Sequence, residues 1–430
     1  MTAVSSKVFK PVTINVVTGK GGGGHYATYH ALRAIAQQRD LPWQFRVTDM
    51  DDIMESITQQ REAFNLYKLL GSSVSDLYNQ MLKRGWTWLW PLQMRLNKLL
   101  VKLNYKTGVE FFEGYWREQQ PDLVISVVTM CNKVLWEALQ RANPGTPYVT
   151  LPIDFADSPP GFWFEPDTDS FALCGTDKAV EQARIMGVKA SRIVPTSGMV
   201  IHPRFYAAVA GDAPEERLRP NASDAPRAIR PGAEVSVRTA ERRRLGLAPH
   251  KLTGLVMFGG NGSQVMVEIA KRLESYFEDL QLIYLCGRNE PLMTALRQLP
   301  NRQSRLIVGF TQDIPDYMRL ADFFIGKPGP GSLSEALVMQ LPVITVCNAA
   351  TLVHERYNAE WVRSQDVGIV LKRFRHIAQA VDQFLQPEIL YRYQTNVAAI
   401  NNRAVFEVAD FIQQVLAMPF QNQPVVPLQS

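Results

Sequence analysis

The residues of this 430-residue chain best suited to chemistry lie in glycine-rich loops and just after apolar runs. A run of four glycines, residues 21–24, ends at His25. An imidazole has a pKa near neutrality, so His25 can act as a base, a proton relay or an acceptor ligand. Asp154 and Asp157 follow the apolar run 148–153, and one of them is the competing acid, with turn capping as the alternative role for both. We expect His25 and Asp154 as candidate catalytic residues. Gly23 and Gly24 are expected to lie beside the acceptor substrate.

The first glycine loop matches several known sequence motifs in its order of residues alone. Residues 19–24 fit G-x-G-x-x-G, and a dinucleotide interpretation adds Asp49 as the ribose ligand. A nucleoside-triphosphate loop requires Lys and Ser or Thr where His25 and Tyr26 stand. A tight turn without any ligand remains the structural alternative. The loop alone therefore predicts a helix start suited to an anion or a polar acceptor.

A second glycine loop, residues 326–331, follows a short strand pattern and precedes a helix. Its glycines would let a diphosphate approach the backbone at the helix N-terminus. Glu335 lies in the first turns of that helix, where its carboxylate could accept hydrogen bonds from both ribose hydroxyls. The alternative is a carboxylate that stabilises the helix dipole. Another anion-binding turn, residues 259–263, opens the same half of the chain and favours a nucleotide.

The elements around these loops predict an α/β fold. A β-branched run at residues 12–17, the glycine loop, a helical pattern from Ala27 and a strand at 45–48 form a βαβ unit. The same order restarts after a segment rich in Pro and Arg, so we expect two doubly wound, Rossmann-like domains facing a cleft. Further strands are expected at 123–128, 148–153, 171–174, 255–258, 282–286, 306–308, 323–325 and 342–346. The expected divisions are 1–206, a linker or insertion at 207–250, a nucleotide-binding domain at 251–390, and a helix and tail at 391–430, with one long helical stretch at 391–416.

Composition excludes several classes of protein. No apolar run approaches the roughly 18–20 residues of a membrane-spanning helix, and the first ten residues lack a signal core. The four cysteines are far apart, which excludes a disulfide scaffold and fits a reducing cytoplasm. The net charge of +5 is too small to decide a partner by itself.

One segment, residues 81–106, combines basic residues and tryptophans without any acidic residue. This composition suits a membrane interface with anionic headgroups, where each basic residue contributes about 1 kcal/mol. The alternative is a helix packed on the core with a solvated basic face. Basic and aromatic residues also occur on nucleic-acid surfaces, but no nucleic-acid motif accompanies them, so we expect no nucleic acid. The residues expected at the membrane or acceptor are Lys83, Arg84, Trp86, Trp88, Trp90, Arg95 and Lys98.

Taken in order, several segments resemble the GT-B glycosyltransferases of the family 28 type. These include monogalactosyldiacylglycerol synthases, processive diacylglycerol glucosyltransferases and the peptidoglycan N-acetylglucosaminyl transferase. The matching segments are the loop ending at His25, then 258–262, 286–290, 308–315 and 327–336, then Glu355 and Asn358. The resemblance implies two Rossmann-like domains, a UDP-sugar in the C-terminal one, an acceptor in the N-terminal one, inversion at the anomeric carbon and no required metal or cofactor.

Carried over by position, the resemblance implies the donor-binding residues. Phe310 and Thr311 would lie at the uracil, Glu335 at the ribose, and Glu355 and Asn358 at the sugar. Arg288 would belong to the donor site, and Gly260, Gly262, Pro330, Gly331 and Ser332 would lie near the diphosphate.

Two positions depart from the family pattern. Lys20 stands where plant members carry an acid proposed as the base, and His354 stands where a Gln commonly precedes Glu355. Because of Lys20 the resemblance does not identify the catalytic base. Because of His354 it does not identify the donor sugar. The acids at 49–52 resemble the DxD metal motif of the other glycosyltransferase fold, but we expect them to be structural.

From these features we expect an inverting hexosyltransferase that moves a sugar from a UDP-sugar to a membrane lipid such as diacylglycerol. We expect it in the cytoplasm, bound peripherally to the inner face of the membrane. The alternatives are a nucleotide-sugar epimerase of the same fold and a catalytically weak UDP-binding regulatory protein.

Overall fold

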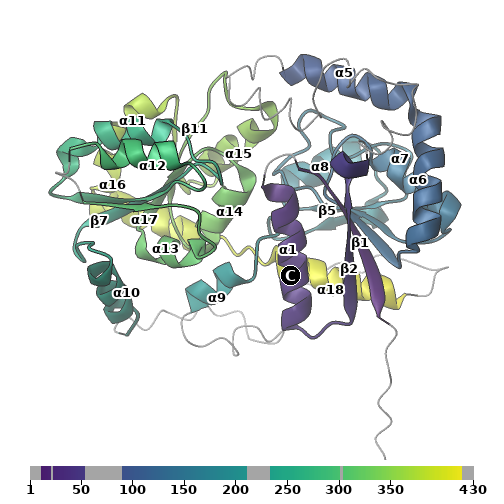
Figure 1. Cartoon of the computed structure of the whole chain (residues 1–430), viewed down its shortest axis with the longest axis horizontal. Coiled ribbons are helices and arrows are strands. Elements are labelled where there is room, and N and C mark those ends of the chain that lie inside the picture. Colours follow the sequence, from purple (N-terminus) through teal and green to yellow (C-terminus); the bar gives the residue numbers. More distant parts are fainter. Residues whose placement is uncertain (1–10, 21–22, 54–89, 211–232, 301–303, 419–430) are drawn as a thin grey trace, which may run out of the picture. The chain divides into compact units, whose positions relative to one another are not determined.

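A computed structural model describes residues 11–20, 23–53, 90–210, 233–300 and 304–418, coloured in Figure 1. The chain forms two compact units, one of residues 1–202 with 403–430 and the other of residues 203–402. Each unit contains a parallel sheet of six strands in its described residues. The α/β fold class is confirmed.

Unit 1 is built on the sheet β2-β1-β3-β4-β5-β6. Its strand bounds are β1 (Val12–Thr18), β2 (Trp43–Asp49), β3 (Leu123–Ser126), β4 (Tyr148–Thr150), β5 (Phe171–Cys174) and β6 (Ile193–Pro195). Its helices are α1 (Gly24–Gln38), α5 (Trp90–Leu103), α6 (Tyr105–Gln119), α7 (Asn132–Ala142), α8 (Asp177–Ile185) and α18 (Ala404–Ala417).

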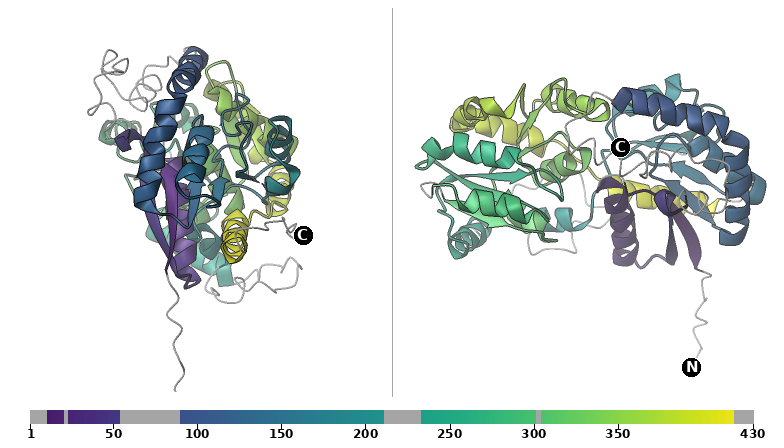
Figure 2. Two further views of the ribbon diagram at one scale, coloured as in Figure 1. Left: turned by 90° about the vertical axis from the view of Figure 1, so that its right-hand side faces the viewer. Right: turned by 45° about the horizontal axis from the view of Figure 1, so that its top comes forward.

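Alternating strand residues bury both faces of this sheet. Ile14 and Val16 of β1 share one apolar cluster with Leu32 of α1 and with the last helix, α18. Val17 and Val124 belong to a second cluster formed with α6 and α7. Because successive strand residues point to opposite faces, α1 and α18 cover one face and α6 and α7 the other (Figure 2).

Unit 2 is built on the sheet β12-β11-β10-β7-β8-β9. Its strands are β7 (Leu252–Met257), β8 (Leu280–Leu285), β9 (Arg305–Val308), β10 (Phe323–Gly326), β11 (Val343–Val346) and β12 (Gly368–Leu371). Its helices are α9 (Arg204–Ala210), α10 (Ala233–Arg244), α11 (Val265–Arg272), α12 (Glu290–Arg297), α13 (Ile314–Leu320), α14 (Pro330–Val338), α15 (Val353–Ser364), α16 (Ile377–Phe384) and α17 (Pro387–Ala398).

The expected strands are present with shifted ends, and two strands were missed. The missed strands are β6 and β12, which have only three and four residues. Both lie at a sheet edge, where a strand has one neighbour and needs little length. Such short apolar runs carry too few residues to show a period.

The segment expected to be a linker, residues 207–250, contains helix α10. Arg242 of this helix is buried and donates to the Leu320 carbonyl at 2.9 and 2.7 Å and to Asp322 at 2.9 Å. Arg238 contacts the same carboxylate at 2.5 Å. These contacts attach α10 to unit 2, so the arginines that suggested a polar linker instead fasten a helix.

The single long helix expected at residues 391–416 is two helices, α17 and α18, which belong to different units. Ser197 holds the chain where it re-enters unit 1, since its hydroxyl accepts from the Arg403 N–H at 2.6 Å. Its own N–H donates to Glu407 at 2.7 Å. α18 then crosses and contacts α1 (Figure 1), and an Arg39 guanidinium nitrogen lies 2.5 Å from the Asp410 carboxylate.

Candidate functional site

In unit 2, the two predicted anion-binding turns follow neighbouring strands. The chain runs from β7 outward to β8 and β9, then returns to the other side of β7 as β10. Gly326 of β10 pairs in parallel with Met257 of β7, so the turns after these strands leave the sheet side by side. Ligands of doubly wound sheets bind at this kind of switch point, where the strand order reverses.

The turn after β7 depends on glycine. Gly259 and Gly262 have φ of 72° and 58°, in the left-handed region that favours glycine. A Cβ on Gly287, in the next loop, would lie 2.0 Å from the Gly260 carbonyl oxygen. That loop therefore packs directly on the predicted diphosphate turn.

Asn289 connects the turn after β7 with the loop after β8. It was not singled out from the sequence. Its amide donates to the Asn261 carbonyl at 2.9 Å, and its side-chain oxygen accepts from the Leu292 N–H at 3.0 Å, capping α12. An Asn directly before a helix start is a recognised capping signal, so the sequence did contain the clue.

The turn after β10 leads from Gly329 into α14, with Pro330 in its first turn. The Ser332 hydroxyl donates to the Gly329 carbonyl at 3.3 Å. Gly331 is exposed, and a Cβ there would meet no atom within 4 Å. The turn thus presents backbone and small side chains at the start of a nine-residue helix, as an anion site requires.

Glu335 lies one turn further along α14. It is half-buried, and among the described residues no hydrogen bond reaches its carboxyl. Burial raises the pKa of this carboxyl to about 7, and the positive charge of Arg204 on α9 opposes the shift. A carboxylate without a protein partner can still accept the two hydroxyls of a ribose.

Phe310 and Arg288 lie together after the strands β9 and β8, at the same edge of the sheet. Phe310 follows β9 and is 54% exposed. The Arg288 guanidinium carbon stands 4.0 Å from the centre of the Phe310 ring, a cation–π contact. Thr311 accepts from the Asp313 N–H at 3.0 Å and so shapes the start of α13. An exposed aromatic ring backed by a cation offers a stacking surface for a base.

Glu355 and Asn358, both predicted at the donor sugar, project from α15 onto the turn after β10. Lys327 donates to Glu355 at 2.8 Å, and the Glu355 side chain is only 8% exposed. Asn358 is fully buried and donates to the Pro328 carbonyl at 2.8 Å. Sequence reasoning missed Lys327, although it follows the strand directly within the quoted motif.

In unit 1, His25 lies at the corresponding switch point, between β1 and β3. Its ring Nδ1 is 2.5 Å from the Val127 carbonyl oxygen, just beyond β3. A carbonyl only accepts, so Nδ1 carries the hydrogen, and in the neutral ring Nε2 has the lone pair. The imidazole is therefore oriented with its basic nitrogen turned away from Val127.

Asp154 is buried and tied to Trp163, whose indole N–H donates to it at 3.1 Å. The neighbouring Asp157 accepts three backbone N–H groups, from Gly161, Phe162 and Trp163, at 2.6–2.8 Å. Asp157 therefore organises the turn that carries Trp163. Both acids hold one loop together, and only Asp154 remains a candidate for chemistry.

The acids at the end of β2, expected to be structural, contact other residues of the protein. Asp49 accepts from the Tyr26 hydroxyl at 2.6 Å and from the Asp51 N–H at 2.9 Å. Lys20 forms an ion pair with Asp52. The ribose role that a dinucleotide pattern would assign to Asp49 is taken by these contacts. In the described part of the chain, no group of three His, Cys, Asp or Glu is placed to hold a metal ion.

The segment expected at a membrane, residues 81–106, is described only from residue 90. Outside the described residues lie Lys83, Arg84, Trp86 and Trp88, and also the side chain of Trp90. Helix α5 buries Met94 and Leu100. It exposes Leu96, Leu99 and Leu103 by 39, 51 and 67%. Arg95 is exposed beside them, whereas the Lys98 ammonium donates to the Pro160 carbonyl at 2.9 Å. No helix in the described ranges is both long and apolar enough to cross a bilayer.

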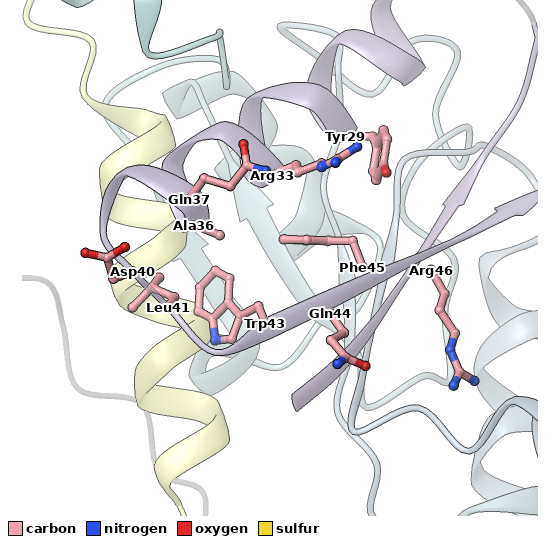
Figure 3. A pocket seen from close by; sticks show the side chains of 10 residues that line it. All are labelled: Tyr29, Arg33, Ala36, Gln37, Asp40, Leu41, Trp43, Gln44, Phe45 and Arg46. Atoms are coloured by element: carbon pink, nitrogen blue, oxygen red, sulfur yellow. The ribbon is translucent and has the colours of Figure 1, made fainter. Parts of the chain in front are cut away.

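An open hollow of about 850 Å³ lies between α1 and the edge strand β2 (Figure 3). Tyr29, Trp43 and Phe45 line it, with the Phe45 ring 6.2 Å from each of the other two rings. None of the predicted site residues lines this hollow. We regard it as a gap in helix–sheet packing.

Comparison with known proteins agrees with this geometry. Residues 255–415 match the glycosyltransferase family 28 C-terminal domain. The match includes the turns after β7 and β10 and the residues Glu335, Glu355 and Asn358.

Two relatives are similar to this chain over most of its length. The spinach (Spinacia oleracea) chloroplastic monogalactosyldiacylglycerol synthase is 23% identical over 94% of this chain and 73% of its own. The processive diacylglycerol beta-glucosyltransferase of Bacillus subtilis is 25% identical over 70% of each chain. Among solved structures, MurG of Acinetobacter baumannii has a TM-score of 0.54 at 13% identity and covers 94% of this chain and 100% of its own.

These matches confirm the resemblance and the GT-B fold, and they support glycosyl transfer as the activity of this protein. The individual site residues stay predictions that the geometry supports.

Proposed function

We propose that this protein transfers a hexose from a UDP-sugar to a membrane lipid of the diacylglycerol type, with inversion at the anomeric carbon. The observation that carries the proposal is Glu335, whose carboxylate accepts no hydrogen bond in the described part of the chain and lies one turn beyond the glycine turn, within the segment that matches the family 28 C-terminal domain. The monogalactosyldiacylglycerol synthase and the diacylglycerol glucosyltransferase among the relatives suggest the acceptor class.

On the donor side, the residues of unit 2 would divide the nucleotide between them. Phe310 would stack on the uracil, and Glu335 would accept the ribose hydroxyls. Backbone N–H groups at Gly331 and Ser332, at the start of α14, would bind the diphosphate and stabilise its growing charge as the sugar leaves.

On the acceptor side, His25 is the group best oriented to assist deprotonation. The Val127 carbonyl fixes the Nδ1–H tautomer, so Nε2 can take the proton of the lipid hydroxyl. The hydroxyl oxygen then forms a bond to the anomeric carbon, and the bond from that carbon to the β-phosphate oxygen breaks. UDP leaves as the anion, so charge and atoms balance without any added reagent. We propose that no metal or cofactor is required.

The lipid acceptor brings the reaction to a membrane surface. The exposed leucines of α5, with Arg95 beside them, have the composition of a helix that lies in the interface. We propose peripheral binding to an anionic, cytoplasmic membrane face through this helix.

The deciding experiment incubates the protein with UDP-glucose, UDP-galactose or UDP-N-acetylglucosamine and vesicles containing diacylglycerol, and analyses the products by mass spectrometry. We expect UDP release together with a glycosylated lipid, unchanged by a metal chelator. Sugar interconversion without an acceptor would identify an epimerase instead. UDP binding without turnover would identify a regulatory protein.

The assignment of His25 has its own test. General-base assistance contributes about 10²–10⁴-fold in rate, so His25→Ala should lose that factor while it keeps UDP affinity. His30→Ala is the matched control, because His30 is exposed on the same helix, and it should keep full turnover. Normal turnover in His25→Ala with a dead Asp154→Asn would move the base to the carboxylate.

A further inference from the structure

The donor turn after β10 contains an ion pair that the roles assigned above do not use. Lys327, the first residue after β10, donates from its ammonium to Glu355 Oε1 at 2.8 Å. The Lys327 side chain is 42% exposed, whereas that of Glu355 is 8% exposed. A mostly buried carboxylate is thus reached by a lysine that stands partly in solvent.

The surroundings of Glu355 leave one oxygen of the carboxylate for a ligand. A Cβ on Gly329 would lie 3.7 Å from Oε1, so the carboxylate lies against the turn, with Oε1 held by Lys327. Among the described residues, no hydrogen bond reaches Oε2. Carboxylate oxygens only accept, and the matching donors on a hexose are its hydroxyls.

Asn358, one turn further along α15, points the same way. Its amide nitrogen donates to the Pro328 carbonyl, while its side-chain oxygen is buried without a partner in the described part of the chain. A buried acceptor without a hydrogen bond is costly, so a ligand donor that reached it would be favoured. The side chains of Glu355 and Asn358 therefore both lie beside the turn. In each, one polar atom makes a hydrogen bond within the protein and one oxygen has no partner among the described residues.

We propose that Lys327 is a positioning residue for the donor sugar: it fixes Glu355 so that the second carboxylate oxygen accepts a hexose hydroxyl. The inference rests on the proposed function, since it requires a UDP-sugar in unit 2. Lys327 acts through Glu355, so it should affect the affinity for UDP-hexose and not the affinity for UDP, which lacks the hexose.

A lysine beside a diphosphate turn has an obvious competing role, direct contact with the phosphates. The burial of Glu355 argues against it. Removing the ammonium would leave that carboxylate buried without a counter-charge, which is strongly unfavourable. The pair should therefore persist when the donor binds, and Lys327 should contribute little to UDP itself.

The test compares the affinities of UDP, UDP-glucose and UDP-galactose by calorimetry in four proteins: wild type, Lys327→Met, Glu355→Gln and the double variant. We expect Lys327→Met to lower the affinity for the preferred UDP-hexose by about 10–100-fold, the range of one hydrogen bond to a charged group. UDP affinity should change by less than about threefold. The double variant should bind no worse than Glu355→Gln, because coupled residues are not additive.

Lys327→Arg keeps the charge and should recover at least part of the UDP-hexose affinity, which loss of folding could not mimic. Equal losses for UDP and UDP-hexose in a folded Lys327→Met protein would make Lys327 a phosphate ligand and overturn the inference, as would additive effects in the double variant. Wild type that binds neither UDP nor UDP-hexose would instead remove the proposed function, and this inference with it.

Discussion

Three polar side chains at the donor turn differ in how far the protein itself satisfies them. The Glu335 carboxyl has no protein partner among the described residues, Glu355 has one ion pair, and Asn358 has one of its two polar atoms bonded. Unsatisfied groups of this kind lower the stability of the free protein and favour a ligand that supplies donors. The three residues therefore mark where hydroxyl groups of a ligand are expected.

The raised pKa of Glu335, about 7, predicts a pH dependence of nucleotide binding. Ribose hydroxyls donate to the ionised carboxylate, and the protonated form loses one acceptor site. Affinity for UDP should therefore fall as pH drops through 7, by roughly tenfold between pH 8 and pH 6. Calorimetry over this range measures it.

Glu335→Gln is the control for that profile, because it cannot ionise at this site. The phosphates of UDP also titrate near pH 6, and their contribution appears in both proteins. Identical pH profiles for wild type and Glu335→Gln would show that Glu335 does not contact the ribose.

At the scale of single elements, α5 and α10 have similar compositions but differ in which side chains they bury. Both are rich in basic residues, but Arg242 of α10 is buried against Leu320 and Asp322. α5 instead exposes three leucines at spacings of three and four residues, on one stripe of the helix. Burial, which composition does not reveal, separates a structural basic helix from a candidate interfacial one.

The exposed stripe of α5 predicts the membrane behaviour. Each leucine that inserts contributes on the order of 1 kcal/mol, so replacing Leu96, Leu99 and Leu103 with Ser should weaken binding to anionic vesicles about 10²-fold. Ile185→Ser is the matched control, since Ile185 is 73% exposed on α8 of the same unit. Vesicle flotation at low and high salt measures both. Equal flotation of the two variants would place the anchor elsewhere.

At the scale of the whole molecule, unit 1 is assembled from two distant parts of the chain. Residues 403–430 belong with residues 1–202, and α18 buries Val408, Phe411 and Ile412 in the core of the first sheet. The Phe411 ring lies 5.1 Å from that of Phe171 on β5. The stability of the N-terminal sheet therefore depends on the last described helix of the chain.

Phe411→Ala should accordingly destabilise unit 1 by about 3–5 kcal/mol, the range for a buried phenylalanine. Hydrogen exchange should increase in the strands of unit 1, while the strands of unit 2 and UDP affinity stay unchanged. Tyr391→Ala, at a 71% exposed position of α17, is the surface control and should change stability by less than about 0.5 kcal/mol. Uniform exchange changes in both units would argue against this division.

Much of the fold was predictable because its signals are local. The β-branched run at residues 12–17, the glycine turns and the helix that carries Glu335 follow from side-chain periodicity and from the backbone freedom of glycine. The family resemblance then placed Glu335, Glu355 and Phe310 on helices and a loop that follow strands at one sheet edge.

Tertiary structure decided what depends on residues far apart in sequence. The adjacency of the turns after β7 and β10 follows from strand order, and the His25 tautomer follows from Val127, 102 residues away. The pairing of Lys327 with Glu355 and the return of α18 to unit 1 have the same origin. Each depends on which elements pack together. A local pattern specifies an element and the chemistry it carries, whereas burial and strand order determine which side chains meet.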